Sequence, residues 1–301
     1  MILAATKIEN ATTHNSTGVV LQFPRSATQP TPSVKMVVPC YNEAKRLDTA
    51  TFIAFLSQNA NISMVFVNDG SRDATLDVLA EIQAACPAQV EVLSLRQNSG
   101  KAEAVRQGLQ YATASDAAFV GYWDADLATP LDAITDFLRV GQRFDTIDVI
   151  FGARRMMLGH RVERTIGRRL VSRVCATLAR VAVRLPIGDT QCGAKMLRNT
   201  EALSNALKTP FSAGWLFDVE LFTRLSAQTE EAHRAFYEFP LAEWTEVAGS
   251  KVSGRAILRA GFAMLRLIAE SRFGLPAPVA ARPVPEVDLI EAAATPLAKA
   301  A

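Results

Sequence analysis

Short apolar segments, each followed by a polar loop and then by a helical pattern, constrain the fold of this chain most. We expect strands at 34–39, 63–67, 90–95 and 117–123, and helices at 44–58, 71–84 and 100–114. Strands and helices that alternate at this spacing predict crossover units, and therefore a parallel sheet. In such sheets ligands bind beyond the carboxyl ends of the strands. A functional site is therefore expected in the loops that begin at Tyr41, Asn68, Gln97 and Asp124.

The remaining segments divide the chain into four parts. Residues 1–33 are rich in Thr, Ser, Asn and Gln and lack the charged-then-apolar order of a signal peptide, so we expect a disordered leader. We expect a folded domain over 34–250, an amphipathic helix over 251–273, and a disordered tail rich in Pro and Ala over 274–301. Every apolar stretch of about 18 residues is interrupted by charge, so the sequence does not predict a membrane-spanning helix.

The composition argues against several functional classes. Apolar residues make up 49% of the chain and the formal net charge is +2, which leaves no overall basic surplus for binding nucleic acid. The cysteines Cys40, Cys86, Cys175 and Cys192 lack the paired spacing of a zinc site or of a disulfide framework. We expect reduced, buried or half-buried thiols and a cytosolic compartment.

Two carboxylates follow the expected strand at 117–123. Asp124 and Asp126 are one residue apart, and a turn at this point would aim both at one cation. Mg²⁺ and Mn²⁺ take carboxylate ligands and often share their coordination with substrate phosphates. The other interpretation is a pair of acids that stabilises the start of the helix at Pro130. The pair by itself leaves both interpretations open.

Two further loops carry polar groups at the same expected edge. In Asn68-Asp69-Gly70-Ser71, Asp69 is a candidate acceptor of hydrogen bonds from a nucleobase or ribose, or else part of a tight turn that caps a helix. In Pro39-Cys40-Tyr41-Asn42-Glu43, Tyr41 is a candidate for stacking on a base and Glu43 for accepting a base N–H. The alternative for this second loop is a proline-led turn that opens a helix.

Lys101 follows a turn of small residues and stands at the expected start of a helix. A cation at this place suits a pyrophosphate. The glycine spacing of the NTPase phosphate loop is missing, and so is a G-x-G-x-x-G segment after the first strand. The sequence therefore argues against a P-loop NTPase and against a dinucleotide-binding oxidoreductase.

Eight segments, in their order and spacing, resemble one known family. They are VPCYNE (38–43), VNDGS (67–71), NSGKA (98–102), DADL (124–127), GAR (152–154), DTQCGAK (189–195), WLFDVE (215–220) and WTEVAGSK (244–251). The first four resemble the inverting family 2 glycosyltransferases of the GT-A fold. The second four are similar to the dolichyl-phosphate β-glucosyltransferase branch. The resemblance covers 34–273 and implies an α/β domain, with a mixed, mostly parallel sheet flanked by helices and with C-terminal amphipathic helices that face a membrane.

The resemblance also implies an activity and a set of residues. The activity is transfer of glucose from UDP-glucose to a polyprenyl phosphate, with Mg²⁺ or Mn²⁺ on Asp126 and Asp124. The implied nucleotide-sugar contacts are Pro39, Tyr41, Glu43, Asp69, Lys101, Asp124, Gln191 and Asp218. The implied acceptor-phosphate contacts are Arg154, Arg168, Ser250 and Lys251, with Arg154 and Arg168 counted as catalytic beside the two carboxylates. The alternatives are GDP-mannose or a UDP-N-acetylhexosamine as donor, a saccharide acceptor, and a non-catalytic sugar-nucleotide or membrane-binding protein.

The sequence departs from the family pattern at two positions, and a third position favours one branch of the family. Asn68 stands where the family usually has an acid, and Ala102 stands where it often has glycine. Ala128 stands where relatives that make mannosyl lipids have an amide, which favours a glucosyl branch. Asp218 and Glu220 are candidates for binding sugar hydroxyls, or else a cap and an exposed acid at the start of a helix.

Arginines gather in the second half of the chain. They are Arg154, Arg155, Arg161, Arg164, Arg168, Arg169, Arg173, Arg180 and Arg184, and a second segment contains Arg255, Arg259 and Arg266. Apolar residues interleave with both sets at helical spacing, which is typical either of helices that lie on an anionic membrane surface or of docked helices with a solvated face. Two adjacent signals favour the membrane, and we expect peripheral binding at its cytoplasmic face.

A lipid phosphate acceptor explains why the motifs contain no obvious general base. The three histidines, His14, His160 and His233, lie outside every motif. A phosphate monoester has a second pKa of about 6, so it is largely dianionic at neutral pH and attacks with little help. Cations that position the acceptor are then needed more than a base is.

Overall fold

A computed structural model describes residues 31–154, 161–162, 176–229, 231–245, 254–273 and 285–290. In this part of the chain the main sheet has eight strands in the order β10-β3-β2-β1-β4-β7-β5-β8. Their bounds are β1 (Val34–Cys40), β2 (Ile62–Asp69), β3 (Val90–Leu95), β4 (Phe119–Trp123), β5 (Val149–Ala153), β7 (Ala194–Arg198), β8 (Phe236–Pro240) and β10 (Val287–Ile290). A second, two-stranded sheet pairs β6 (Arg161–Val162) with β9 (Glu243–Trp244).

The main sheet is mixed but mostly parallel, as predicted. β1 pairs in parallel with β2 and β4, β2 with β3, and β5 with β8. β7 is antiparallel to both β4 and β5. The four strands expected from the sequence are therefore neighbours, and the loops that follow β1, β2, β3 and β4 leave from one edge.

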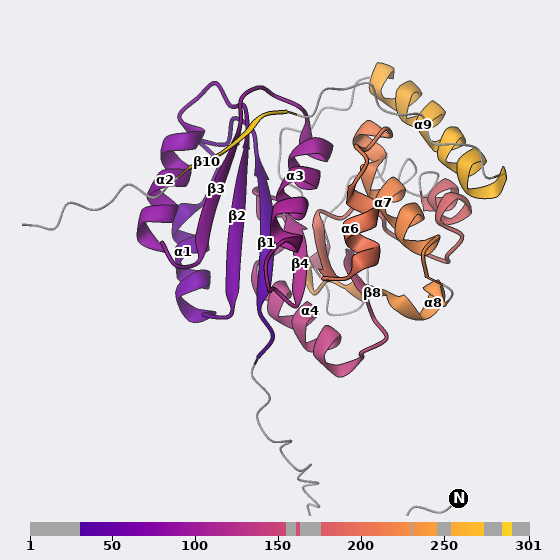
Figure 1. Ribbon diagram of the computed structural model, residues 1–301, viewed down its shortest axis with the longest axis horizontal. Coiled ribbons are helices and arrows are strands. Elements are labelled where there is room, and N and C mark those ends of the chain that lie inside the picture. Colours follow the sequence, from indigo (N-terminus) through magenta and orange to yellow (C-terminus); the bar gives the residue numbers. More distant parts are fainter. Residues whose placement is uncertain are drawn as a thin grey trace, which may run out of the picture. The chain divides into compact units, whose positions relative to one another are not determined.

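Helices cover both faces of the sheet (Figure 1). Their bounds are α1 (Thr49–Gln58), α2 (Thr75–Ala85), α3 (Lys101–Thr113), α4 (Asp132–Arg143), α6 (Glu201–Leu207), η1 (Gly214–Leu216), α7 (Phe217–Ser226), α8 (Ala232–Ala235) and α9 (Gly254–Phe273), and residues 176–183 are also helical. Successive strand residues point to opposite faces. Met36 and Val38 accordingly pack with α1, α2 and α4, whereas Val37 packs with α3, α6 and α7. The expected helices after the first three strands are confirmed.

The prediction of a disordered tail is wrong for Val287–Ile290. These residues form β10, which pairs antiparallel with the edge strand β3. Gln83 Nε2 donates to the carbonyl of Ile290 over 3.0 Å, and Arg96 forms ion pairs with Glu286 and Asp288. A segment of four residues with one acid is too short for its hydrophobic pattern to predict a strand. The segment forms a strand because it pairs with the exposed N–H and C=O groups at the edge of β3. Residues 1–30, 274–284 and 291–301 lie outside the described residues.

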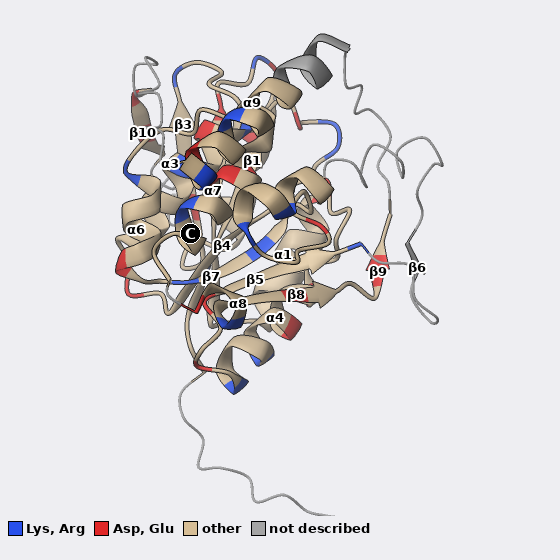
Figure 2. Ribbon diagram, turned by 90° about the vertical axis from the view of Figure 1, so that its right-hand side faces the viewer, with Lys and Arg blue, Asp and Glu red and all other residues tan. Residues whose placement is uncertain are grey.

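α9 has two apolar faces. Met264 and Leu267 are buried against the core that contains α7, and α9 also contacts η1. On the opposite side Phe262, Leu265 and Phe273 are 74%, 61% and 77% exposed. Figure 2 shows uncharged residues along much of the described part of this helix. Among the described residues, no helix is both long and apolar enough to span a bilayer.

Candidate active site

A tight turn after β4 carries the two carboxylates predicted to hold a cation. Leu127 has a positive φ of 52°, and its N–H donates to the carbonyl of Asp124. The backbone N–H of Ala128 donates to Asp126 Oδ1 over 3.1 Å. Burial, and then the nearby charge of Asp124, raise the pKa of Asp126, although the bond from Ala128 opposes the shift. The two carboxylates are thus close enough to repel each other, which is the arrangement that a dication relieves.

Lys101 joins this pair. It is the first residue of α3, directly after Gly100 with its positive φ of 89°. Its Nζ lies 2.5 Å from Asp124 Oδ1, and its side chain is 46% exposed. Partial burial lowers the pKa of Lys101, but the charge and hydrogen bond of Asp124 outweigh this effect, so the pKa is raised. The structure therefore brings the predicted phosphate-binding lysine and the predicted metal carboxylates together.

Gly193 makes room for the Asp124 carboxylate. The backbone N–H of Asp124 donates to the Gly193 carbonyl over 2.9 Å. A Cβ atom at Gly193 would lie 1.9 Å from Asp124 Oδ2. The segment Cys192-Gly193 therefore forms the surface on which the carboxylate rests, a role that the sequence pattern did not reveal.

The loop after β1 lies beside the same carboxylates. Burial raises the pKa of Glu43, the ion pair with Arg46 lowers it, and the charge of Asp126 raises it further. Glu43 binds Arg46 through bonds of 3.0 and 2.6 Å, and Tyr41 is 40% exposed. The N–H of Glu43 donates to Thr75 Oγ1 over 2.8 Å, which ties this loop to the start of α2. A base contact from Pro39, Tyr41 or Glu43 stays a prediction.

Asp69 holds the loop that leads to Lys101. Its Oδ1 accepts from the N–H of Ser99 over 2.7 Å, and its Oδ2 accepts from Gly100 N–H over 2.9 Å and Asn98 Nδ2 over 3.2 Å. Burial raises its pKa, and the two backbone bonds oppose that shift. The sequence predicted contact with a nucleoside. The structure shows that the Asp69 carboxylate already accepts hydrogen bonds from residues 98–100 of the loop after β3, and the nucleoside contact stays a prediction.

Replacing Asp69 with Asn should therefore destabilise the protein. An amide offers one acceptor oxygen and turns an NH₂ group toward a backbone N–H, so at least one donor of residues 98–100 loses its partner. We expect the free energy of unfolding in urea to fall by about 1–3 kcal/mol. Asp145→Asn, at an exposed carboxylate, is the control and should change it by less than about 0.5 kcal/mol. Equal unfolding curves for the two variants would contradict this role.

Arg154 is engaged by a partner that sequence reasoning missed. Its Nε and Nη2 donate to the two carboxylate oxygens of Asp189 over 2.7 and 2.8 Å, and its guanidinium lies 5.1 Å from the ring centroid of Trp244. Burial alone would lower its pKa, but the bonds to Asp189 raise it instead. An acceptor phosphate would have to share Arg154 with Asp189. Arg168, Ser250 and Lys251 lie outside the described residues.

The acids of α7 are buried. Glu220 accepts from the N–H groups of Ser212 and Ala213 and pairs with Arg224, so the alternative of an exposed helix acid is wrong. Asp218 accepts from the Tyr122 hydroxyl and pairs with Lys195 Nζ at 2.8 Å. Burial by itself raises the pKa of Asp218 and lowers that of Lys195, whereas the contact between the two side chains at 2.8 Å favours the charged form of each.

Gln191 offers an unused donor. Its Nε2 is buried and has no hydrogen-bond partner among the described residues. Gln191 belongs to the same segment as Gly193, which contacts Asp124. A buried donor without a partner is costly, so this amide fits a site that is completed by a ligand oxygen.

The carboxylates of the β4 turn also fit a hard divalent cation. Among the described residues there is no group of three or more His, Cys, Asp or Glu side chains that would enclose a metal. Mg²⁺ is commonly held by one or two carboxylates together with waters and substrate phosphates, which matches Asp124 and Asp126. A cavity of about 420 Å³ lies beyond the ends of β2 and β3. It is lined by residues 68, 70–72, 76 and 94–98.

Several solved structures with the same architecture are those of one enzyme. Glucosyl-3-phosphoglycerate synthase from Mycobacterium tuberculosis, solved with Mn²⁺ and UDP-glucose, has a TM-score of 0.55 and is 17% identical, covering 82% of this chain and 81% of that one. Its complex with Mg²⁺ and UDP has a TM-score of 0.56 at 18% identity, with the same coverage. At these identities the similarity shows the fold, which is of the GT-A type.

The sequence comparisons show the family. The family model described as Glycosyl transferase family 2 matches residues 36–204. The dolichyl-phosphate beta-glucosyltransferase of Drosophila melanogaster is 30% identical over 251 residues, covering 77% of this chain and 72% of that protein. The human enzyme of the same name is 28% identical over 256 residues, covering 79% and 75%. The chain is therefore a glycosyltransferase of family 2, and within that family it resembles the dolichyl-phosphate β-glucosyltransferases.

Proposed function

We propose that this enzyme transfers glucose from UDP-glucose to a polyprenyl phosphate with inversion at the anomeric carbon. One observation carries the proposal: Asp124, Asp126 and Lys101 converge at the carboxyl edge of the sheet, in a chain that resembles dolichyl-phosphate β-glucosyltransferases. Two carboxylates that can hold a dication, together with a neighbouring lysine, suit a nucleoside diphosphate leaving group.

Each group at this edge has a role in the proposal. Asp126 and Asp124 would hold Mg²⁺ or Mn²⁺, and the bound cation would offset the negative charge that develops on the leaving diphosphate. Lys101 transfers part of its interaction from Asp124 to the diphosphate. Gln191 Nε2, which lacks a partner among the described residues, donates to a phosphate or sugar oxygen. Pro39, Tyr41 and Glu43 line the side on which the base would bind.

The acceptor attacks as a phosphate dianion. One phosphate oxygen forms the bond to the anomeric carbon while the bond from that carbon to the UDP oxygen breaks on the opposite side. No proton has to leave the nucleophile, because a phosphate monoester with a second pKa of about 6 is already ionised at neutral pH. This agrees with the buried, paired state of Asp218 and Glu220, which are poorly placed to act as a base.

The outer face of α9 fits the surface of a membrane. A helix that meets only water on one side carries polar residues there. α9 instead exposes Phe262, Leu265 and Phe273 along one stripe, with Arg272 exposed beside them. Aromatic and aliphatic residues with neighbouring cations are typical of helices that lie at an anionic interface. In the proposal this face binds the cytoplasmic side of the membrane that contains the lipid acceptor.

A transfer assay tests the proposed reaction. Purified protein with Mg²⁺ and a short polyprenyl phosphate is incubated with labelled UDP-glucose, and in parallel with labelled GDP-mannose and UDP-N-acetylglucosamine. We expect label in the butanol-extractable lipid with UDP-glucose, and at least about tenfold less with the other donors, the range in which pocket contacts discriminate. A saccharide or a small phosphorylated acceptor is tested in the same assay. If label appears only in the water-soluble product, the acceptor is a soluble molecule and the lipid acceptor is refuted.

Removing the two exposed phenylalanines should weaken membrane binding. We expect Phe262→Ser/Phe273→Ser to lower flotation with phosphatidylglycerol–phosphatidylcholine vesicles by at least about tenfold, because each buried phenylalanine contributes about 1.5–3 kcal/mol. Leu289→Ser in β10, which also removes an exposed apolar side chain, is the matched control. Equal flotation of the double variant and the control would contradict the assignment of this face.

A further inference from the structure

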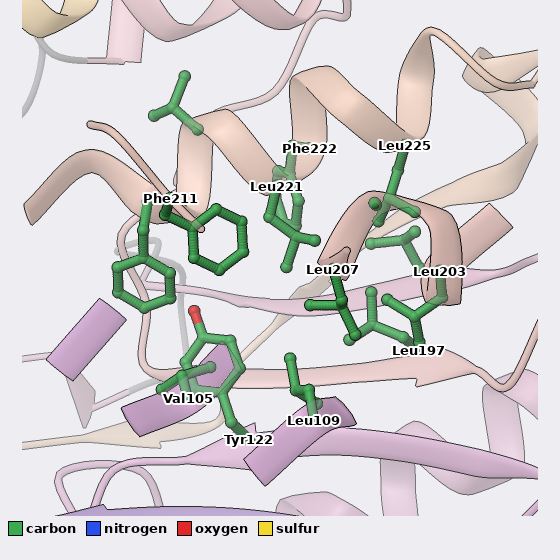
Figure 3. Close-up of a cluster of buried hydrophobic side chains, with 14 of the residues drawn as sticks. Val105, Leu109, Tyr122, Leu197, Leu203, Leu207, Phe211, Leu221, Phe222 and Leu225 are labelled. Atoms are coloured by element: carbon green, nitrogen blue, oxygen red, sulfur yellow. The ribbon is translucent and has the colours of Figure 1, made fainter. Parts of the chain in front are cut away.

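A buried polar cluster lies directly behind the carboxylates of the β4 turn. Lys195 on β7 is fully buried, and its cross-strand neighbour on β4 is Tyr122. Asp218 enters the cluster from α7. Figure 3 shows Tyr122 extending from the sheet toward the helices, with its hydroxyl at the tip. Three elements far apart in the sequence therefore bring their polar groups to one enclosed point.

Contacts at Lys195 Nζ run in two directions. On one side it pairs with Asp218 Oδ1 at 2.8 Å, and the same oxygen accepts from the Tyr122 hydroxyl. On the other side it donates to the backbone carbonyl of Cys192 over 2.6 Å. The rings of Tyr122 and Phe222 lie 4.9 and 5.5 Å from it. The ammonium group is thus enclosed by one carboxylate, one carbonyl and two aromatic faces.

The Cys192 carbonyl connects this cluster to the site. Gly193 follows it directly, and the Gly193 carbonyl accepts from the N–H of Asp124. The Asp124 carboxylate rests so closely on Gly193 that no Cβ would fit between them. A bond that fixes Cys192 therefore fixes the surface against which Asp124 lies.

Apolar residues would stabilise this position at least as well as a buried ion pair does. Enclosing an ion pair usually gains little over apolar residues of similar volume, because both charges lose their water. Lys195 and Asp218 are nevertheless buried, and Lys195 bonds directly to Cys192 in the segment that supports Asp124. This placement indicates a role in the geometry of the site.

We propose that Lys195 is a positioning residue of the transfer reaction: balanced by Asp218, its Nζ holds the Cys192 carbonyl, and the Cys192-Gly193 segment in turn aligns Asp124 toward the cation. This inference rests on the proposed function, because it assumes that Asp124 binds the cation. It adds a residue that touches neither the nucleotide sugar nor the acceptor. Groups that orient metal ligands in this way typically contribute about 10- to 100-fold to metal affinity.

The test compares Mn²⁺ binding in variants that keep the cluster packed. Lys195→Met/Asp218→Asn removes both charges at similar volume and leaves an acceptor for the Tyr122 hydroxyl. Mn²⁺ binding is followed by electron paramagnetic resonance at one fixed concentration of UDP for every variant, and the melting temperature is recorded in parallel. We expect cooperative melting, as in the wild type, and Mn²⁺ affinity at least about tenfold weaker. Lowered melting temperature with unchanged affinity would assign the cluster to stability and overturn the proposal.

One further variant and the wild-type protein keep the result interpretable. If the double variant fails to fold, Asp218→Asn by itself replaces it, since it keeps the shape of the cluster and should weaken Mn²⁺ binding more than about threefold. Unchanged affinity in that variant overturns the proposal. If the wild type and the variants bind Mn²⁺ equally well, the role of Lys195 is refuted and the proposed function is unaffected. Wild-type protein that binds no Mn²⁺ refutes the proposed metal site itself.

Discussion

Asp126→Asn should lower Mn²⁺-dependent sugar transfer by at least about a hundredfold, the effect of removing one main electrostatic contact to the transition state. Asp126 follows Asp124 by two residues in the turn after β4, and a dication bound there would relieve the repulsion between the two carboxylates. An amide keeps the shape and the bond from Ala128 but removes one charge. The measurement is the initial rate of label transfer to polyprenyl phosphate at saturating UDP-glucose.

A matched control separates the site from the general charge of the protein. Asp136→Asn removes a carboxylate that pairs with Arg139 on the exposed side of α4. Its rate should stay within about twofold of the wild type, since exposed ion pairs contribute about 1 kcal/mol or less. If Asp126→Asn matched this control, Asp126 would have no part in the chemistry.

Gly193→Ala should separate activity from stability. The added methyl group would lie 1.9 Å from Asp124 Oδ2, so the flexible carboxylate must move away. Gly193 has no positive φ, and an alanine backbone therefore fits. We expect Mn²⁺-dependent turnover to fall by about tenfold or more, in the range seen when a metal ligand loses its orientation. The melting temperature should change little, because only one side chain has to shift.

Gly261→Ala is the control for this substitution. Gly261 is exposed in α9, and a Cβ there would meet nothing within 4 Å. Alanine inside a helix is favoured over glycine by about 1 kcal/mol, so this variant should melt slightly higher and keep its activity. A Gly193→Ala enzyme as active as Gly261→Ala would show that Asp124 does not need its present position.

The sequence predicted the central part of the fold well. The strands β1 to β4 and the helices α1 to α3 lie close to their expected ranges, because period-2 and period-3.6 patterns are local and strong there. The parallel order followed from the alternation of strand and helix. β10 was missed because its order comes from pairing with the edge of β3, which no local pattern encodes.

The sequence pointed to residues that the structure places close together, but it did not predict which other side chains they contact. The motifs pointed to Asp124, Asp126 and Lys101, and the structure places Lys101 against Asp124. Contacts between distant segments could not be predicted, since a sequence motif does not state the partner of a charged group. The bonds that Asp69 accepts from residues 98–100, and those that Arg154 donates to Asp189, are of this kind.

Buried charge was the other feature beyond sequence reasoning. Asp218 follows aromatic and apolar residues at the start of α7, where an acid usually favours the helix terminus and stays exposed. Its burial depends on Lys195 and Tyr122, which come from neighbouring strands of the sheet. The paired register of β4 and β7 brings Tyr122 beside Lys195, and the packing of α7 on the sheet brings Asp218 to both.

Calorimetric titration of the protein with UDP, once with Mn²⁺ and once with a chelator, tests the metal-dependent nucleotide site most directly. We expect saturable uptake of one UDP per chain with Mn²⁺, and affinity weaker by at least about tenfold when the metal is withheld. Asp126→Asn should bind UDP with Mn²⁺ as weakly as the wild type binds it without. No uptake of UDP or GDP with Mn²⁺ or Mg²⁺ present would contradict a site in which the β4 carboxylates hold a dication against a diphosphate.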